Sequence, residues 1–171
     1  ENRSSRGLGD VYKRQCIQRV AMTLAEAGLE PIRISVASPE HMEKYGRVLD
    51  SSLQIEWVVD SSPYAGPIEA ILDALTDPFC NDPLQIAPVD VPWLELDLLV
   101  DLERGIGDCK VAMPVCSGRT HPLLALIRPE VANLVGSSRR PLRDQFRGMD
   151  HVLVEAREEV VRNINQPSDL E

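Results

Sequence analysis

The chain has 171 residues, of which 43% are hydrophobic and 26% charged, so its composition predicts a globular domain with a buried core. Its 27 acidic residues outnumber its 18 basic residues, and the formal net charge of −9 argues against nucleic acids and anionic membranes as partners. No apolar run is long enough for a transmembrane span, and the four cysteines form no CxxC pair, so we expect a cytoplasmic protein with reduced thiols.

Residues 1–15 differ from the rest of the chain. They carry four basic and two acidic residues and show neither a helical nor a strand period. The stretch SRGLGDVYKRQ resembles the in-frame translation of an adapter used in sequencing libraries. We therefore expect residues 1–15 to be disordered and foreign to the fold, and residues 16–171 to form a single domain; a natural disordered arm is the alternative.

Helices and strands alternate along the first half of this domain. The elements predicted in chain order are a helix from Ile17 to Gly28, a strand over 31–36, a helix from Pro39 to Gly46, a strand over 55–59, a helix after Gly66-Pro67, a strand over 84–89 and a helix over 94–105. Strands separated by helical crossovers predict a parallel sheet covered on both faces, which is the doubly wound α/β class.

The second half has a different pattern. The strand-like runs 110–115 and 123–127 are too close for a crossover helix, so we expect an antiparallel element there. Short helices are predicted over 131–135 and 139–146, and a further strand over 151–154.

Two acidic residues follow predicted strands. Asp60 comes after the strand 55–59, and Asp90 comes after the run 84–89. Ligands of open parallel sheets bind outside the carboxyl ends of the strands, where a carboxylate can hold Mg²⁺ together with substrate phosphates. The alternative for each residue is that it caps the helix that follows.

Further candidates for anion binding lie along the chain. Gly66-Pro67 opens a helix whose free amides can approach a phosphate, although such a pair is also an ordinary turn. His121, beside Arg119, stands between two predicted strands and can face an anionic ligand or serve a structural role.

Two pairs of polar residues complete the set of candidates. Arg139 and Arg140 can bind a phosphate in bidentate fashion or form a solvated helix face. Asn163 and Asn165 are two residues apart on an extended segment, so they share a face, where they can meet a ligand or satisfy backbone groups. No GxSxG, HExxH or Walker motif is present, which disfavours covalent hydrolase chemistry.

Five segments, in their order and spacing, resemble the molybdenum cofactor guanylyltransferase family. These segments are residues 60–72, which end in YAGPIEAIL, and then APVDVPWLELDLL (87–99), GRTHPLLAL (118–126), SSRRPLRDQF (137–146) and NINQPSDL (163–170). The resemblance implies a Rossmann-like nucleotidyltransferase fold and the transfer of GMP from Mg²⁺-bound GTP to the terminal phosphate of molybdopterin, with release of pyrophosphate.

The resemblance also implies a role for each candidate residue. Asp90 matches the catalytic, metal-binding acid. The residues implied on the nucleotide side are Ser35, Asp60, Gly66 and Pro67, and those on the molybdopterin side are His121, Arg139, Arg140, Asn163 and Asn165. GTP and molybdopterin are the implied substrates, with transient contacts to molybdoenzymes or other cofactor-synthesis proteins.

The chain also departs from the family pattern. The family begins with a strand and a glycine-rich loop that carries an arginine and a lysine, and here that region is missing, so we expect impaired catalysis and unpaired neighbouring strands. Val91 stands where the family usually has threonine, Gln166 stands where a threonine commonly caps the last helix, and Glu69 adds a negative charge near the expected phosphates. The alternatives are a related nucleotidyltransferase acting on another nucleotide or acceptor, and a non-catalytic module that binds a pterin or a partner protein.

Overall fold

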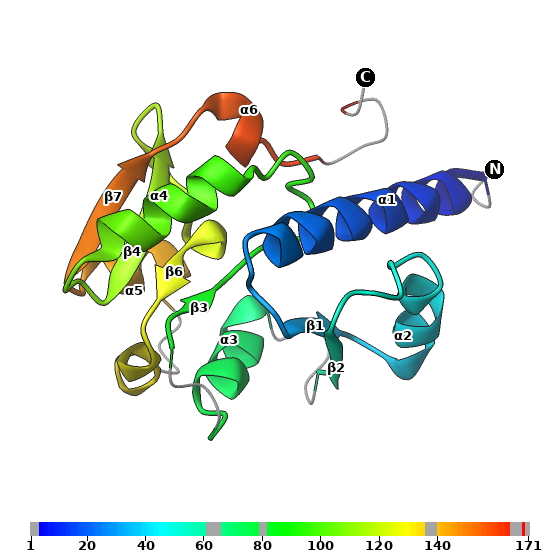
Figure 1. Ribbon diagram of the computed structural model, residues 1–171, viewed down its shortest axis with the longest axis horizontal. Coiled ribbons are helices and arrows are strands. Elements are labelled where there is room, and N and C mark those ends of the chain that lie inside the picture. Colours follow the sequence, from blue (N-terminus) through cyan, green and yellow to red (C-terminus); the bar gives the residue numbers. More distant parts are fainter. Residues whose placement is uncertain (1–3, 61–65, 79–81, 136–139, 165–168, 170–171) are drawn as a thin grey trace.

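The first half of the chain alternates helices and strands, as the sequence predicts (Figure 1). The computed structural model describes residues 4–60, 66–78, 82–135, 140–164 and 169, with the backbone alone described for residues 4–12. The elements of this half are α1 (Ser4–Glu26), β1 (Ile32–Val36), α2 (Pro39–Gly46), β2 (Ile55–Val59), α3 (Pro67–Leu75), β3 (Leu84–Gln85) and α4 (Leu96–Ile106). Strand β3 is shorter than predicted.

The second half confirms the strands predicted over 110–115 and 151–154, but only residues 126 and 127 of the strand predicted over 123–127 form one, because a 3₁₀ helix begins at Pro122. The elements of this half are strands and several short helices. They are β4 (Val111–Cys116), β5 (Arg119–Thr120), the 3₁₀ helix η1 (Pro122–Leu124), β6 (Leu126–Ile127), the 3₁₀ helix η2 (Pro129–Asn133), α5 (Leu142–Arg147), β7 (His151–Glu155) and α6 (Glu158–Val161). The small strand β5 and the helix α6 were not predicted, because elements of two and four residues show no hydrophobic period.

Helix α1 begins earlier than predicted. Its buried face consists of Ile17, Val20, Ala21 and Leu24, as expected, and Gly28 follows it with a φ of +74°. The helix nevertheless extends back to Ser4, through residues that we expected to be disordered. Propagating a helix costs much less than nucleating one, so a helix that is fixed by packing at Ile17 to Leu24 can extend back toward the N-terminus.

The strands form two separate sheets. Strands β1 and β2 pair in parallel, with Ile34 opposite Trp57. In the larger sheet β4 pairs in parallel with β7 and antiparallel with β5 and β6, and β3 pairs with β6. The α/β class and the antiparallel element in the second half are therefore confirmed.

Two clusters of apolar side chains hold these layers together. The larger cluster joins α1 and α4 to β1 and to one face of the β4 sheet, with Leu102 fully buried. The smaller one joins α3, η2 and α5 to the other face of that sheet, with Phe146 fully buried. Strand β4 is thus covered on both faces.

The main-chain edges of β1 and β3 face a common space. Ile32 donates to Gln54 and Val36 accepts from Asp60, so residues 32, 34 and 36 bond toward β2. Because successive main-chain groups of a strand point to opposite sides, those of Arg33 and Ser35 point away from β2. Within the described part of the chain β1 pairs with β2 alone and β3 with β6 alone, so the expected unpaired neighbouring strands are observed.

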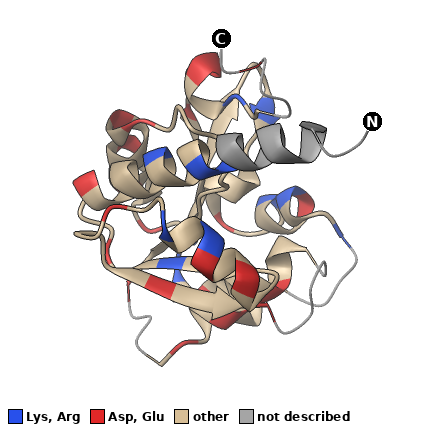
Figure 2. Ribbon diagram, turned by 90° about the vertical axis from the view of Figure 1, so that its right-hand side faces the viewer, with Lys and Arg blue, Asp and Glu red and all other residues tan. Residues whose placement is uncertain are grey.

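Charged residues are spread over most elements. On the side of the molecule shown in Figure 2, acidic residues occur on several helices, strands and loops, and the basic residues do not gather into one patch. Among the described residues, no helix has the length and apolar character needed to cross a membrane.

Candidate active site

A cavity of about 790 Å³ separates β1 from β3. Helix α1 lines it through Ile17, Val20, Ala21 and Leu24, and α3 lines it through Ala70, Ile71 and Ala74. The four residues predicted for the nucleotide side, Ser35, Asp60, Gly66 and Pro67, all line this cavity. The fold therefore brings together residues that are up to 32 positions apart in the sequence.

Ser35 and Asp60 meet at one end of the β1–β2 pair. The Ser35 hydroxyl donates a hydrogen bond to Asp60 Oδ1, and the Asp60 amide donates to the Val36 carbonyl over 2.9 Å. Parallel pairing of β1 with β2 places the two carboxyl ends side by side, which explains why these residues lie together. A carboxylate held in this way can accept hydrogen bonds from the hydroxyl groups of a ribose.

Gly66 precedes the first turn of α3 and has a φ of +94°, which favours glycine. A Cβ atom built on it would meet no atom within 4 Å, and Pro67 at the start of the helix has no amide hydrogen to offer. There is therefore room for a ligand beside Gly66, and the first amide hydrogens of the helix come after Pro67. Glu69, the acid that we expected near the phosphates, is exposed and is not among the residues that line the cavity.

Asp90 lies in the turn between β3 and α4, one residue beyond Val89, which lines the cavity. Its Oδ2 accepts a hydrogen bond from Asn163 Nδ2 over 3.2 Å, and its carbonyl accepts one from the Ile164 amide over 2.8 Å. Burial raises the pKa of the Asp90 carboxyl above its usual value, and hydrogen bonds from its own main chain and from Asn163 oppose the shift. A carboxylate short of solvation is well suited to bind a cation.

His121 lies beside the end of β4, on the route into the 3₁₀ helix η1. Its amide donates to the Pro114 carbonyl over 2.9 Å, and its ring is half-buried. Burial lowers the pKa of His121, and the nearby Arg119 charge lowers it further. Asn163 follows β7, which runs parallel to β4 and ends beside it, with Glu155 opposite Val115. His121 and Asn163 therefore both come after the carboxyl end of a strand at the same edge of the sheet.

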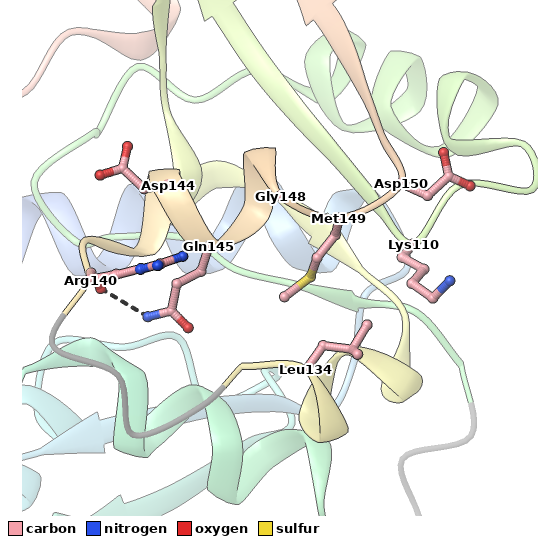
Figure 3. Close-up of a pocket in the computed structure, with 8 residues that line it drawn as sticks. All are labelled: Lys110, Leu134, Arg140, Asp144, Gln145, Gly148, Met149 and Asp150. Atoms are coloured by element: carbon pink, nitrogen blue, oxygen red, sulfur yellow. Dashed lines mark hydrogen bonds between the residues drawn. The ribbon is translucent and has the colours of Figure 1, made fainter.

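Arg140 lies at the other end of β4. It lines a separate hollow of about 500 Å³ together with Lys110, which immediately precedes β4, and with Gln145 of α5 (Figure 3). Gln145 Nε2 donates to the Arg140 carbonyl over 2.9 Å. The structure therefore does not bring Arg140 next to Asn163 or Asp90. The other two acceptor-side residues, Arg139 and Asn165, lie outside the described residues, as does Gln166.

The set of possible metal ligands around Asp90 is small. Among the residues that the structure describes, no group of three His, Cys, Asp or Glu side chains could hold a metal ion. Mg²⁺ retains most of its water and typically takes one or two carboxylates plus substrate phosphates, so a lone half-buried Asp90 fits a substrate-borne Mg²⁺ better than a permanent metal site.

The basic residue of the cavity lining was missed from the sequence. Arg33 is the only basic side chain that lines the described cavity, and it bonds to Glu56 over 3.2 Å and to Asp77. These bonds raise the pKa of Arg33, so its charge is fixed and shared with two carboxylates. No local pattern could have shown this, since its partners are 23 and 44 residues away.

Comparison with known proteins identifies the family. The family model of the MobA-like NTP transferase domain matches residues 3–159. The chain belongs to this family. The resemblance seen in the sequence is thereby confirmed, and the chain is a nucleotidyltransferase of the MobA-like type.

Solved structures share the fold of this MobA-like domain at low sequence identity. Molybdopterin-guanine dinucleotide biosynthesis protein A from Archaeoglobus fulgidus matches with a TM-score of 0.60 and 20% identity, over 86% of this chain and 81% of its own. Bifunctional IspDF from Campylobacter jejuni matches with a TM-score of 0.68 and 11% identity, over 91% of this chain and 45% of its own. A homologue of Mycobacterium tuberculosis rv0371c from Mycobacterium sp. strain JC1 matches with a TM-score of 0.60 and 15% identity, over 88% of this chain and 78% of its own. None of the curated proteins matches the chain significantly.

Proposed function

We propose that this MobA-like domain transfers GMP from Mg²⁺-bound GTP to molybdopterin, releasing pyrophosphate. The observation that carries the proposal is the convergence of Ser35, Asp60, Gly66 and Pro67 on one cavity whose border at Val89 adjoins Asp90. A relative in fold is named for the biosynthesis of molybdopterin-guanine dinucleotide, and the sequence segments 60–72 and 163–170 resemble that family.

The proposed reaction is a single displacement at phosphorus. A terminal phosphate oxygen of molybdopterin forms a bond to the α-phosphorus of GTP, and the bond from that phosphorus to the bridging oxygen of the β-phosphate breaks. Pyrophosphate leaves with the electron pair of that bond. No covalent enzyme intermediate is required, so the task of the protein is to align two anions and to offset their charge.

Each described residue has a part in that task. Asp60, held by Ser35, faces the nucleotide sugar, and the open N-terminus of α3 at Gly66 faces its phosphates. Asp90 is the carboxylate that would hold Mg²⁺, which supplies charge neutralisation at the phosphates. Asn163 keeps the Asp90 carboxylate oriented, and His121 and Asn163 meet the acceptor.

The charges that line the cavity favour slow turnover by this chain. The single basic residue, Arg33, is bonded to two carboxylates, whereas four acidic residues, Glu30, Asp60, Asp73 and Asp82, also line the space. A triphosphate would therefore meet little uncompensated positive charge from the described residues, which weakens its binding. This supports the proposal that the activity of the chain is impaired.

A transfer assay tests the proposed function. The purified protein is incubated with molybdopterin, Mg²⁺ and either GTP or CTP, and the dinucleotide product and pyrophosphate are measured. We expect slow product formation with GTP and less with CTP. We expect Asp90→Asn to lower the rate at least about 100-fold, as for the loss of a metal-binding group.

The matched control is Asp97→Asn, which removes an exposed carboxylate from the first turn of α4. It should leave the rate unchanged. Equal or greater transfer from CTP would contradict guanine specificity, and full activity of Asp90→Asn would contradict the metal-binding role. Binding of molybdopterin without binding of GTP would favour the non-catalytic alternative.

A further inference from the structure

The segment that carries Asn163 is fastened to the Asp90 turn at three successive residues. Arg162 places its guanidinium carbon 4.2 Å from the centre of the Trp93 ring. Asn163 bonds to the Asp90 carboxylate, and the Ile164 amide bonds to the Asp90 carbonyl. The side chain of Ile164 is 3% exposed and packs with Cys16 and Trp93.

Two further contacts hold the neighbourhood of this segment: Val160 and Val161 are each 3% exposed in the larger apolar cluster, and Arg162 Nη2 donates to the Asp169 carbonyl over 3.0 Å. Helix α6, which precedes it, is only four residues long, and Arg162 and Asn163 are both exposed. A helix of one turn is not stable without tertiary contacts. Beyond Val161, the contacts that fix the chain on either side of Asn163 are those of its two neighbours, Arg162 and Ile164.

Trp93 contributes to both of those contacts. It lies three residues after Asp90, in the same turn, where the Leu94 amide donates to the Val91 carbonyl over 3.2 Å. Val91 is 1% exposed, so the turn is anchored in the core. The cation of Arg162 over the indole ring and the apolar contact of that ring with Ile164 both stabilise this arrangement.

We propose that Trp93 is a positioning residue for the acceptor side of the site: its ring holds Arg162 and Ile164, so that the Asn163 amide stays against the Asp90 carboxylate. The assignment of this side to the acceptor rests on the proposed function, whereas the clamp itself is a property of the described contacts. Trp93 acts through Asn163 and does not itself touch the reacting atoms.

Amide hydrogen exchange tests the clamp without any substrate. In Trp93→Leu, which keeps an apolar side chain but lacks an aromatic face, we expect the Ile164 amide to exchange about fivefold faster, the change that 1 kcal/mol produces. Trp93→Phe retains an aromatic face and should restore most of the protection. Arg162→Gln, which leaves Trp93 in place, should speed exchange, whereas Arg162→Lys should do so less.

The matched control uses the second tryptophan of the chain. Trp57→Phe and Trp57→Leu in β2 should leave the Ile164 amide unchanged, because Trp57 packs in the cluster that joins α1 to β1. Equal protection in Trp93→Leu, Trp93→Phe and the wild-type protein would overturn the proposal, as would unchanged protection in Arg162→Gln.

A binding measurement then separates the clamp from the proposed function. Trp93→Leu should weaken molybdopterin binding, followed by pterin fluorescence, more than it weakens GTP binding. Faster exchange at Ile164 with unchanged molybdopterin affinity would overturn the positioning role. If the wild-type protein binds no molybdopterin while the exchange pattern holds, the proposed function fails and the clamp stands.

Discussion

Strands β4 and β1 have similar lengths but very different surroundings. Residues 111–115 of β4 are all buried, and the strand pairs along both edges and is covered on both faces. In β1 buried residues alternate with more exposed ones, and the edge opposite β2 faces the cavity of about 790 Å³. The described nucleotide-side residues lie in the less tightly packed region, around β1, β2 and α3. Asn163 and His121 instead follow strands of the well-packed region, which is the sheet around β4.

The largest expected difference between the two regions is in the free energy of unfolding that is lost when an isoleucine is replaced by alanine. Ile127→Ala removes a fully buried residue of β6, and Ile34→Ala removes one that is 8% exposed and lines the cavity. We expect urea unfolding to show a loss of about 4 kcal/mol for Ile127→Ala and about 2 kcal/mol for Ile34→Ala, since Ile34 already borders empty space. Equal losses would mean that the cavity is closed in solution.

Amide exchange should show the same difference within one strand. The amides of Arg33 and Ser35 face the cavity, whereas those of Ile32 and Ile34 bond toward β2. We expect the former pair to exchange on the order of 100-fold faster than the amides of Met113 and Val115 in β4, with Ile34 between them. Uniform protection along β1 would show that its free edge is paired in solution.

A pH titration probes the well-packed region through His121. Because its pKa in the folded protein is lowered below the usual 6.5, the unfolded chain binds the proton more readily. The stability linked to His121 is therefore fully present above pH 6.5 and is lost as the pH falls through the folded pKa. Arg119→Gln should reduce the loss, as monitored by urea unfolding at several pH values, whereas a histidine resonance titrating at the usual pH would contradict the lowered pKa.

The smallest expected effect concerns Asp90, whose pKa is raised in the folded protein, whereas that of His121 is lowered. The two groups therefore change the free energy of unfolding in opposite directions as the pH rises. The folded pKa of Asp90 lies above the usual 3.8, so the favourable contribution exists below that value and is lost as the pH rises through the folded pKa. At neutral pH Asp90→Asn should therefore unfold at a slightly higher urea concentration than the wild-type protein. The difference should vanish in acid, and a destabilised Asp90→Asn at neutral pH would contradict the desolvation of this carboxylate.

Regular elements of at least five residues were predicted well because each has its own local signal. The apolar face from Ile17 to Leu24, the strand at 55–59 and the Gly66-Pro67 helix start all appear where the sequence places them. The early start of α1 was not predicted because residues 1–15 show no hydrophobic period. Helix α6 was not predicted because it is one turn long, and the burial of Val160 and Val161, rather than periodicity, stabilises it.

The candidate site was predictable in part. Residues at the ends of parallel strands, such as Asp60 and Ser35, meet because the topology requires it, and the observed hydrogen bond follows from that topology. Arg140 was grouped with Asn163 from the family resemblance, yet it lies at the opposite end of β4. The contact between Trp93 and Arg162 joins residues that are distant in sequence and gives no local signal.

The sequence by itself determined the α/β class, the order of the main elements and the residue types available for nucleotide chemistry, because hydrophobic period, glycine and proline act over a few neighbouring residues. Only the tertiary structure decided that Glu69 is left out of the cavity lining, that Arg33 shares its charge with two carboxylates, and that Asn163 reaches Asp90. Those contacts join residues far apart in the chain, and their geometry is set by how the helices and sheets pack rather than by any local preference.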